Sequence, residues 1–272
     1  MLKIVATDMD GTLLNDKKEM PENTFEVIKQ LHARGITFAV ASGRQHFSLQ
    51  KLYEEVKDDI VIISGNGGVI IDKGELIYSN PMDKQAVAKI IEFAFATPEL
   101  KVNLCGLNAT YMFENNVTNN MPMYLVESHF PKRVIIDNLE DVPADEEILQ
   151  VAIFDDRFNS KENIYDKLKH LEGSCHLTIS GSEWVDIVNK GVNKGAAIKI
   201  LQDMLGATPE ETMVFGDERN DYEMMQQAYY SYAMANAVDQ IKEVSNFVAP
   251  TNEEAGVIRI LENFLAMTAS GS

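Results

Sequence analysis

Short apolar runs alternate with helical segments over the first eighty residues, and this order is the feature that most constrains the fold. Strand-like runs are expected at 2–7, 36–41 and 60–63, with helices at 21–33 and 45–56 between them. An apolar run of roughly four to eight residues is typical of a strand buried on both faces. Strands separated by helices predict a parallel sheet with right-handed crossovers.

The alternation stops near residue 82, after a hairpin expected at 69–78, and it resumes near residue 188. Between these points, strand-like pieces follow one another with helices expected at 84–96 and 160–171, which predicts an inserted α+β domain with an antiparallel sheet. The predicted fold class is therefore α/β, with a doubly wound, Rossmann-like parallel-sheet core. The predicted domains are core 1–82, insertion 83–187 and core 188–272.

The acidic composition excludes several classes of partner. The formal net charge is −18 and the pI is about 4.6, with no cluster of Lys and Arg. Nucleic acids and anionic membranes need a basic face, so neither is expected as a partner. No apolar run is long enough for a membrane span, and no signal peptide is recognisable, so a cytoplasmic location is expected. Cys105 and Cys175 are expected to be buried free thiols.

Two carboxylates follow the first expected strand, in the segment 8–12. Residues two apart in an extended chain point to the same side, so Asp8 and Asp10 can converge at the strand's carboxyl end. Open parallel sheets bind their ligands at this edge. Gly11 permits a sharp exit from the strand. An ordinary acidic turn is the alternative interpretation, because Asp-Gly is a common turn dipeptide.

A second acidic cluster, at 216–221, follows another buried strand. A helix N-terminus, where Asp and Asn are favoured, explains Asn220 or Asp221. It does not explain Asp217, which stands at the end of the strand. Two strand ends that carry carboxylates predict an oxygen-rich site suited to Mg²⁺.

Three weaker signals lie at other strand or helix ends. Ser42 and Gly43 follow the second strand, where a hydroxyl and a backbone N–H can cradle a phosphate, although a Ser N-cap is also common. Lys194 stands at a helix start, where a positive charge is disfavoured unless an anion is near. Asn66 follows the third strand, and a structural turn is the preferred interpretation there.

The conjunction of these signals predicts a metal-assisted phosphate site better than any one of them. No P-loop pattern is present, and no dinucleotide glycine fingerprint follows the first strand. The five histidines have no paired spacing, so a zinc site is not expected. A metal and a lysine would also let an anionic substrate bind an acidic protein.

These residues resemble the four motifs of the haloacid dehalogenase superfamily of phosphotransferases, over essentially the whole chain. The subgroup resembled is the Cof-like phosphatases, in which the insertion is a large α/β cap. The matching motifs, in chain order, are Asp8-x-Asp10-x-Thr12, Ser42-Gly43-Arg44, Lys194 and Gly216-Asp217-x-x-Asn220-Asp221.

The resemblance implies a magnesium-dependent phosphatase of small phosphorylated metabolites, such as sugar phosphates. In such enzymes Asp8 attacks phosphorus to form an aspartyl-phosphate, and Asp10 acts as acid and then as base. Mg²⁺ is held by Asp8, the backbone carbonyl of Asp10 and Asp217, with Asp221 in support. The phosphate is held by Ser42, the backbone at Gly43 and Met9, Lys194 and Asn220.

Two other functions share these residues. A phosphomutase of the same superfamily would return the phosphate to its substrate, and release of inorganic phosphate without isomerisation excludes it. A phospho-acceptor domain or a metabolite-binding module would be non-catalytic. A receiver domain is about half this length and has no insertion, which disfavours that alternative. Nothing in the sequence indicates an oligomeric state.

Overall fold

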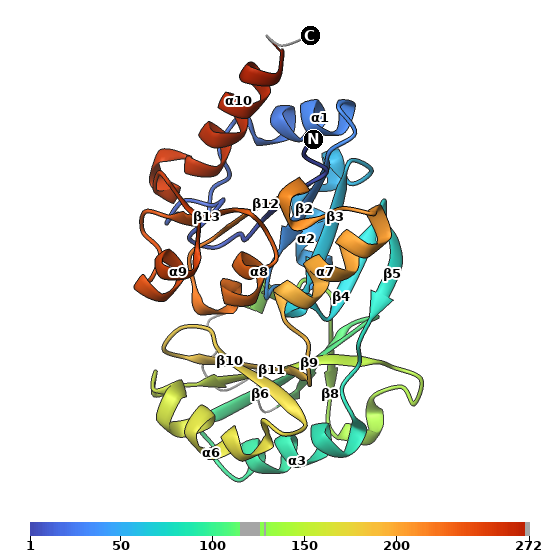
Figure 1. Cartoon of the computed structure of the whole chain (residues 1–272). Coiled ribbons are helices and arrows are strands. Elements are labelled where there is room, and N and C mark those ends of the chain that lie inside the picture. The colour runs from blue at the N-terminus through green and yellow to red at the C-terminus, as the bar shows by residue number, and fades with distance from the viewer. Residues whose placement is uncertain (115–125, 128, 270–272) are drawn as a thin grey trace. The chain divides into compact units, whose positions relative to one another are not determined.

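A computed structural model describes residues 1–114, 126–127 and 129–269, and contacts divide the chain into two compact units, each with its own sheet (Figure 1). The first unit comprises 1–42, 50–77 and the chain from 193 onwards, and the second comprises 43–49 and 78–192. The domain boundaries expected from the sequence, at 82/83 and 187/188, remain predictions.

The first unit is built on an eight-stranded sheet with the order β14-β13-β12-β1-β2-β3-β4-β5. All pairs from β14 to β3 are parallel, and β3 pairs with β4 antiparallel. The strands are β1 Ile4–Thr7, β2 Thr37–Ala41, β3 Ile60–Ser64, β4 Val69–Asp72, β5 Glu75–Ser79, β12 Thr212–Gly216, β13 Tyr230–Met234 and β14 Phe247–Ala249.

Burial explains why the central strands read as continuous apolar runs. Every residue of β1, β3 and β12 is buried, as expected for parallel strands covered on both faces. The order places β1 and β12 side by side, so their carboxyl ends open at the same edge. The predicted α/β class with a doubly wound parallel core is confirmed.

The helices of the first unit form two packed groups. Helix α1 packs against α10 and β2, while α8 packs against α7, α9 and β12. Their bounds are α1 Thr24–Ala33, α2 His46–Leu52, α7 Lys194–Leu205, α8 Tyr222–Gln226, α9 Asp239–Val244 and α10 Gly256–Ala269. The first residues of α2, up to Leu49, group with the second unit.

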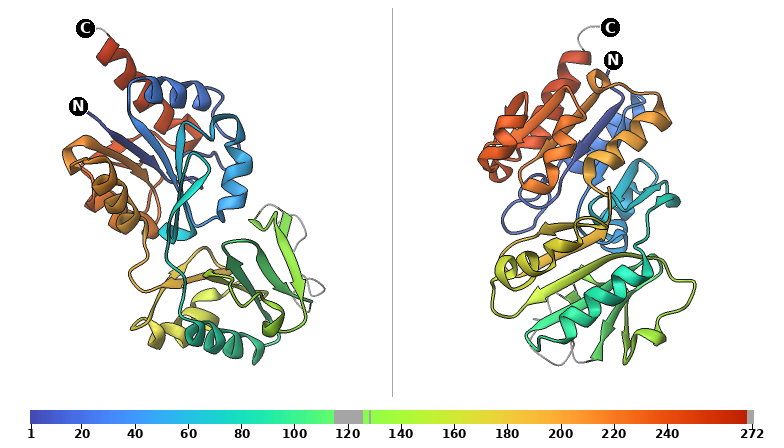
Figure 2. Two further views of the ribbon diagram at one scale, coloured as in Figure 1. Left: turned by 90° about the vertical axis from the view of Figure 1, so that its right-hand side faces the viewer. Right: turned by 60° about the horizontal axis from the view of Figure 1, so that its bottom comes forward.

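The second unit contains a six-stranded sheet with the order β10-β11-β9-β6-β7-β8. Its pairs are antiparallel, as predicted, except that β7 and β8 run parallel. Helix α3 packs along β6 and β9 (Figure 2). The bounds are α3 Lys84–Phe95, β6 Leu100–Gly106, β7 Thr110–Phe113, β8 Arg133–Ile136, β9 Ile148–Asp155, β10 Cys175–Ile179 and β11 Trp184–Asn189.

The two faces of this sheet differ in chemistry. One face carries the main apolar core of the second unit, including Val102, Val151 and Ile187, packed with α3. The other face carries a smaller aromatic cluster with Phe154 and Trp184. Polar side chains of the same strands also belong to this second face. This second face is therefore partly polar although it is buried.

Asp186 on β11 is a buried acid of that second face. Its carboxylate accepts hydrogen bonds from Gln150 Nε2 and Ser180 Oγ, both at 2.6 Å. Burial raises the pKa of Asp186 to about 6, and these two hydrogen bonds only partly oppose that shift. Because the folded pKa lies above the unfolded value, ionisation of Asp186 removes stability as the pH rises from about 4 through 6.

Asp186→Asn is therefore expected to change the pH dependence of stability. Relative to the unchanged protein, the variant should gain on the order of 2 to 3 kcal/mol in free energy of unfolding between about pH 4 and about pH 8. Urea unfolding of both proteins across this range measures the difference. Parallel stability curves for the two proteins would contradict the assignment.

Three predicted details need correction. The helix expected at 21–33 begins at Thr24, because residues 21–23 form the turn that precedes it. The helix expected at 45–56 ends at Leu52 and continues as a short 3-10 turn. The helix expected at 160–171 is a succession of π, α and 3-10 turns over 161–171.

Within the described ranges, no helix is long and apolar enough to cross a membrane. Cys105 and Cys175 are buried free thiols, as predicted.

Candidate active site

The chain places Asp8 immediately beyond β1 and beside the end of β12. The Asp8 backbone N–H donates to the Phe215 carbonyl at 3.0 Å, which continues the strand pairing to this point. Gly11 then turns the chain with a φ of +86°, and a Cβ atom there would lie 2.3 Å from an oxygen of Asp217. Only glycine fits both the left-handed backbone and this close approach.

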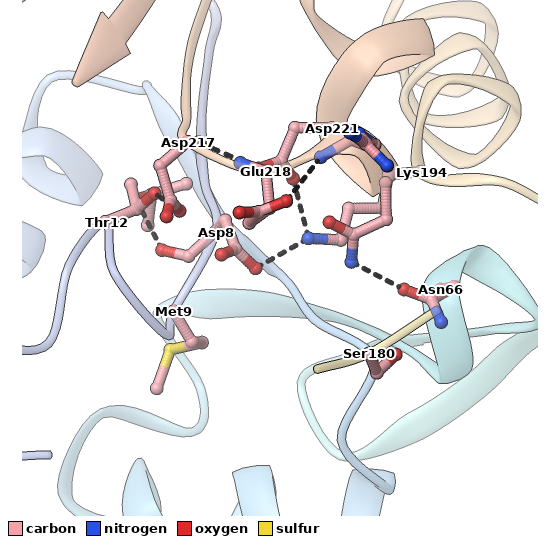
Figure 3. Close-up of polar contacts among 12 residues, drawn as sticks. Asp8, Met9, Thr12, Asn66, Ser180, Lys194, Asp217, Glu218 and Asp221 are labelled. Carbon is pink, nitrogen blue, oxygen red and sulfur yellow. Dashed lines mark hydrogen bonds and ion pairs between the residues drawn. The ribbon is translucent and has the colours of Figure 1, made fainter. Parts of the chain in front are cut away.

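Lys194 joins two of the acids by ion pairs. Its Nζ atom lies 2.6 Å from Asp8 Oδ1 and 2.6 Å from Asp221 Oδ1, and its side chain is fully buried (Figure 3). Lys194 is the first residue of α7, whose N-cap Asn193 accepts a hydrogen bond from the Ala196 N–H. The helix dipole disfavours a cation at this position, and the two carboxylates offset that unfavourable effect.

Asp217 and Asp221 are held by neighbouring groups. Asp217 Oδ1 accepts from the Thr12 hydroxyl at 2.5 Å. Asp221 Oδ2 accepts from the backbone N–H groups of Asp217 and Glu218, at 2.9 and 3.1 Å. Asp221 therefore uses one oxygen to fix the loop after β12 and the other to bind Lys194.

The cluster carries more negative than positive charge. Three carboxylates surround one ammonium group, which leaves an excess of two negative charges when all are ionised. Burial, together with the charges of Asp221 and Asp217, raises the pKa of Asp8 despite the opposing effect of Lys194. Burial raises the pKa of Asp217 to about 7. Burial lowers the pKa of Lys194, but Asp221 and Asp8 outweigh this and raise it.

The residues present fit a divalent cation. Carboxylate oxygens of Asp8, Asp217 and Asp221 lie within 4.8 Å of one another. A hard divalent cation takes such oxygen ligands, and its two positive charges match the excess in the cluster. Both carboxylate oxygens of Asp221 already accept hydrogen bonds, one from Lys194 and the other from backbone N–H groups. Asp8 and Asp217 are consequently the better candidates for direct ligands.

Asp10 stands apart from this group of three acids. Its carboxylate forms an ion pair with Lys18 Nζ at 2.9 Å. Lys18 has a φ of +64°, so its backbone adopts the left-handed conformation although it is not a glycine. Met9, between the two acids, is fully buried, and its Sδ atom accepts from the Tyr53 hydroxyl at 3.0 Å. The side chain of Met9 is therefore not available to a ligand.

Asn66 links Ser42 to Asn220, which directly precedes Asp221 in the chain. Ser42 is buried beyond β2, and its carbonyl accepts from the Asn66 N–H at 3.0 Å. Asn66 Oδ1 accepts from Asn220 Nδ2 at 3.1 Å. Asn66 itself has a φ of +54° in the tight turn at 65–67. Gly43 follows Ser42 directly in the chain and belongs to the second unit.

The sequence indicated no individual role for Thr12 or Lys18, and it favoured a structural turn for Asn66. Thr12 was part of a motif, but the turn at Gly11 breaks the alternation of side chains, so the spacing did not indicate its contact with Asp217. Asn66 lay in the pattern Gly-Asn-Gly after a buried strand, where Asn tolerates a left-handed backbone. The pairing of Lys18 with Asp10 has no signal in a single sequence.

Comparisons with known proteins identify the family of the chain. A model of the haloacid dehalogenase-like hydrolase family matches residues 5–261. A 5-amino-6-(5-phospho-D-ribitylamino)uracil phosphatase of Escherichia coli is 30% identical, over 97% of this chain and 96% of its own. An HMP-PP phosphatase of Cronobacter sakazakii is 27% identical, over 89% of this chain and 87% of its own.

A solved structure, of a protein from Streptococcus mutans, extends the likeness to three dimensions. It superposes with a TM-score of 0.86 at 30% identity, over 98% of this chain and 100% of its own. The predictions of an enzyme of the hydrolase class and of the Cof-like subgroup are confirmed. The chain belongs to the haloacid dehalogenase-like hydrolase family.

Proposed function

We propose that the chain is a magnesium-dependent phosphatase of small phosphorylated metabolites that works through an aspartyl-phosphate on Asp8. The observation that carries this proposal is the buried arrangement of Lys194 with Asp8 and Asp221, beside Asp217. One cation among three acids suits a site that takes up a divalent metal. The bound metal would supply positive charge to the transferring phosphoryl group.

In the first step, one carboxylate oxygen of Asp8 attacks phosphorus. The ion pair with Lys194 fixes the Asp8 carboxylate at the end of β1, so the attacking oxygen is oriented before substrate binds. The bond from phosphorus to the leaving oxygen breaks, and Asp10 protonates that oxygen as it departs. Lys194 opposes the negative charge that gathers near Asp8 in the transition state.

In the second step, Asp10 takes a proton from water, which attacks the phosphoryl group on Asp8. The products are inorganic phosphate and the original Asp8 carboxylate, so the cycle closes without a further reactant. Asp10 is half-exposed, in keeping with a group that must exchange protons with water. Ser42, the backbone at Met9 and Gly43, and Asn220 are the proposed phosphate contacts.

The proposed substrates are small phosphorylated metabolites, because the relatives are named for such compounds. These relatives are named for a phosphorylated ribitylaminouracil and for HMP-PP. Phosphate release from such compounds, measured with Mg²⁺ present, tests the class directly. Isomerisation of a sugar phosphate without release of inorganic phosphate would instead indicate a mutase.

Mg²⁺ is expected to stabilise the folded protein through Asp8 and Asp217. At a concentration about 100 times the dissociation constant, binding adds about 2.7 kcal/mol to the free energy of unfolding, seen as a rise in Tm. Asp217→Asn should lose most of this rise. The matched control, Asp203→Asn, changes an exposed acid near the end of α7 and should keep the full rise. An equal rise in Asp217→Asn would contradict the proposed ligand set.

A further inference from the structure

Strand β8 stands at one end of the sheet of the second unit. Its neighbour among the described strands is β7, with which it pairs in parallel from Arg133 to Ile136. Val134 and Ile135 lie within the strand, yet their side chains are 44% and 46% exposed. An edge strand with exposed apolar side chains is a place where another strand can add to a sheet.

The pairing with β7 identifies the backbone groups at the outer side of β8. The Lys132 carbonyl accepts from the Thr110 N–H at 2.9 Å, so Lys132 directs its backbone groups towards β7. Successive residues of a strand direct their N–H and C=O groups to opposite sides. The backbone groups of Arg133, Ile135 and Asp137 therefore point away from β7.

The two ends of β8 carry opposite charges. Arg133 opens the strand and Asp137 directly follows its last residue, and both side chains are exposed. The Lys132 Nζ atom lies 4.6 Å from the centre of the Phe47 ring, which leaves Arg133 as the cation available at that end. The other strands that end the two described sheets, β5, β10 and β14, carry no such pair of opposite charges.

We propose that β8 pairs antiparallel with β8 of a second copy of this chain, around a two-fold axis at Ile135. In this register Ile135 lies opposite Ile135 of the second copy, and Arg133 lies opposite Asp137 of the second copy. Each residue with outward backbone groups then meets another such residue, as antiparallel hydrogen bonding requires. A two-fold pairing is self-complementary, so one strand supplies both halves of the contact.

Other registers fit the strand less well. A slip of one residue would set outward backbone groups against inward ones and lose the hydrogen bonds. A slip of two residues would separate Arg133 from Asp137, and in one direction it would set Pro131, which has no N–H, against Asp137. The Asp137 N–H already donates to Asp141 Oδ2 at 3.1 Å, so the outer bonds of the proposed pairing run from the Arg133 N–H to the Asp137 carbonyl.

Side chains match on both faces of the proposed pair of strands. Arg133, Ile135 and Asp137 alternate onto one face, where the two Ile135 side chains would lie between two ion pairs. On the opposite face Val134 would meet Ile136 of the second copy, and Ile136 already belongs to the main core of the second unit. Cross-strand pairs of opposite charge and of β-branched side chains both stabilise a sheet. The pairing thus covers the exposed apolar side chains of β8.

Sedimentation velocity of the whole chain, from about 1 to about 500 µM, tests the pairing. The contact is small, so a reversible dimer is expected at the upper concentrations, with a mass that rises from 30.4 kDa towards twice that value. A chain that stays monomeric throughout would overturn the proposal, because the charges of β8 would then only keep other strands away. Association beyond the dimer would contradict the two-fold closure.

Arg133→Glu and Asp137→Lys test the register. Each change sets like charges opposite each other at both ends of the paired strands, so dimerisation of either variant should weaken by about tenfold or more. An equimolar mixture of the two variants should recover the association of the unchanged protein, because the mixed pair has opposite charges at both ends. Glu75→Lys reverses an exposed charge on β5, at the end of the other sheet, and should leave association unchanged.

Undiminished dimerisation of Arg133→Glu and Asp137→Lys would assign the contact to another surface. Weakened variants that do not recover on mixing would overturn the antiparallel register. Both side chains are exposed, so the variants should remain folded, which their Tm values check. If either fails to fold, Ile135→Lys, which sets two like charges at the two-fold axis, takes its place, and undiminished dimerisation of that variant would overturn the proposal. The inference does not depend on the chemistry proposed for Asp8.

Discussion

Asp8→Asn is expected to lower phosphatase activity by at least about 10⁴-fold, because the amide cannot act as the nucleophile. The change keeps the size of the side chain and leaves Lys194 paired with Asp221, so the variant should remain folded. Release of phosphate from an aryl phosphate, with Mg²⁺ present, measures the loss. Circular dichroism and Tm confirm that the variant is native.

Asp16→Asn is the matched control for this loss. Asp16 is an exposed acid in the loop that follows the same motif. Its replacement should leave the activity within about twofold, because changes at exposed sites away from the chemistry have small effects. Activity of Asp8→Asn at the level of this control would remove Asp8 from the mechanism.

Lys194→Met is expected to have the second-largest effect, on stability as well as on activity. Removing one partner of a buried ion pair typically costs about 3 to 5 kcal/mol, because an uncompensated charge stays buried. Here two carboxylates, of Asp8 and Asp221, lose their partner at once. Urea unfolding of the metal-free protein at neutral pH measures the loss.

The loss of stability in Lys194→Met should depend on pH and on Mg²⁺. Without the lysine, the raised pKa values of Asp8 and Asp217 rise further, so stability is lost as the pH rises through those folded values and recovers in acid. Mg²⁺ should restore part of the stability at neutral pH, because it opposes the same charge. A deficit that is independent of both pH and Mg²⁺ would show that packing, not charge, is lost.

Lys199→Met controls for the loss of a lysine from α7. Lys199 pairs with Asp203 at 2.5 Å, and both side chains are more than half exposed. Exposed pairs of this spacing contribute roughly 0.3 to 0.5 kcal/mol. The contrast between Lys194 and Lys199 therefore isolates the effect of burial at two positions of the same helix.

Local sequence patterns predicted the sheet strands well because those strands are buried on both faces. Runs such as 36–41 and 60–63 have no competing periodicity, and they became β2 and β3. The segment 160–171 was predicted less well. Its apolar spacing is helical, but it folds as short turns of three kinds, with the chain packed over the sheet of the second unit.

The candidate site was readable where one short segment carries the signal. Asp8 and Gly11 follow directly from the strand and the turn that contain them. The pairing of Lys194 with Asp221 and that of Asn220 with Asn66 depend on which strands become neighbours. Such pairings join residues far apart in the chain, and one sequence contains no record of them.

The clustering of Asn103, Gln150 and Gln45 in the second unit was unreadable for the same reason. Asn103 and Gln150 look like ordinary polar positions within strands, and Gln45 looks like a helix start. Only the β6–β9 register and the contact of Gln45 with Thr110 bring them together.

In the proposed mechanism, the phosphoryl group passes through a covalent bond to Asp8. Rapid acid quenching of the protein during turnover, followed by peptide mass spectrometry, can detect this bond. A phosphoryl group on the peptide containing Asp8, formed and consumed at rates that match turnover, is the predicted result. Steady release of phosphate with no phosphorylated Asp8 at any quench time would contradict it.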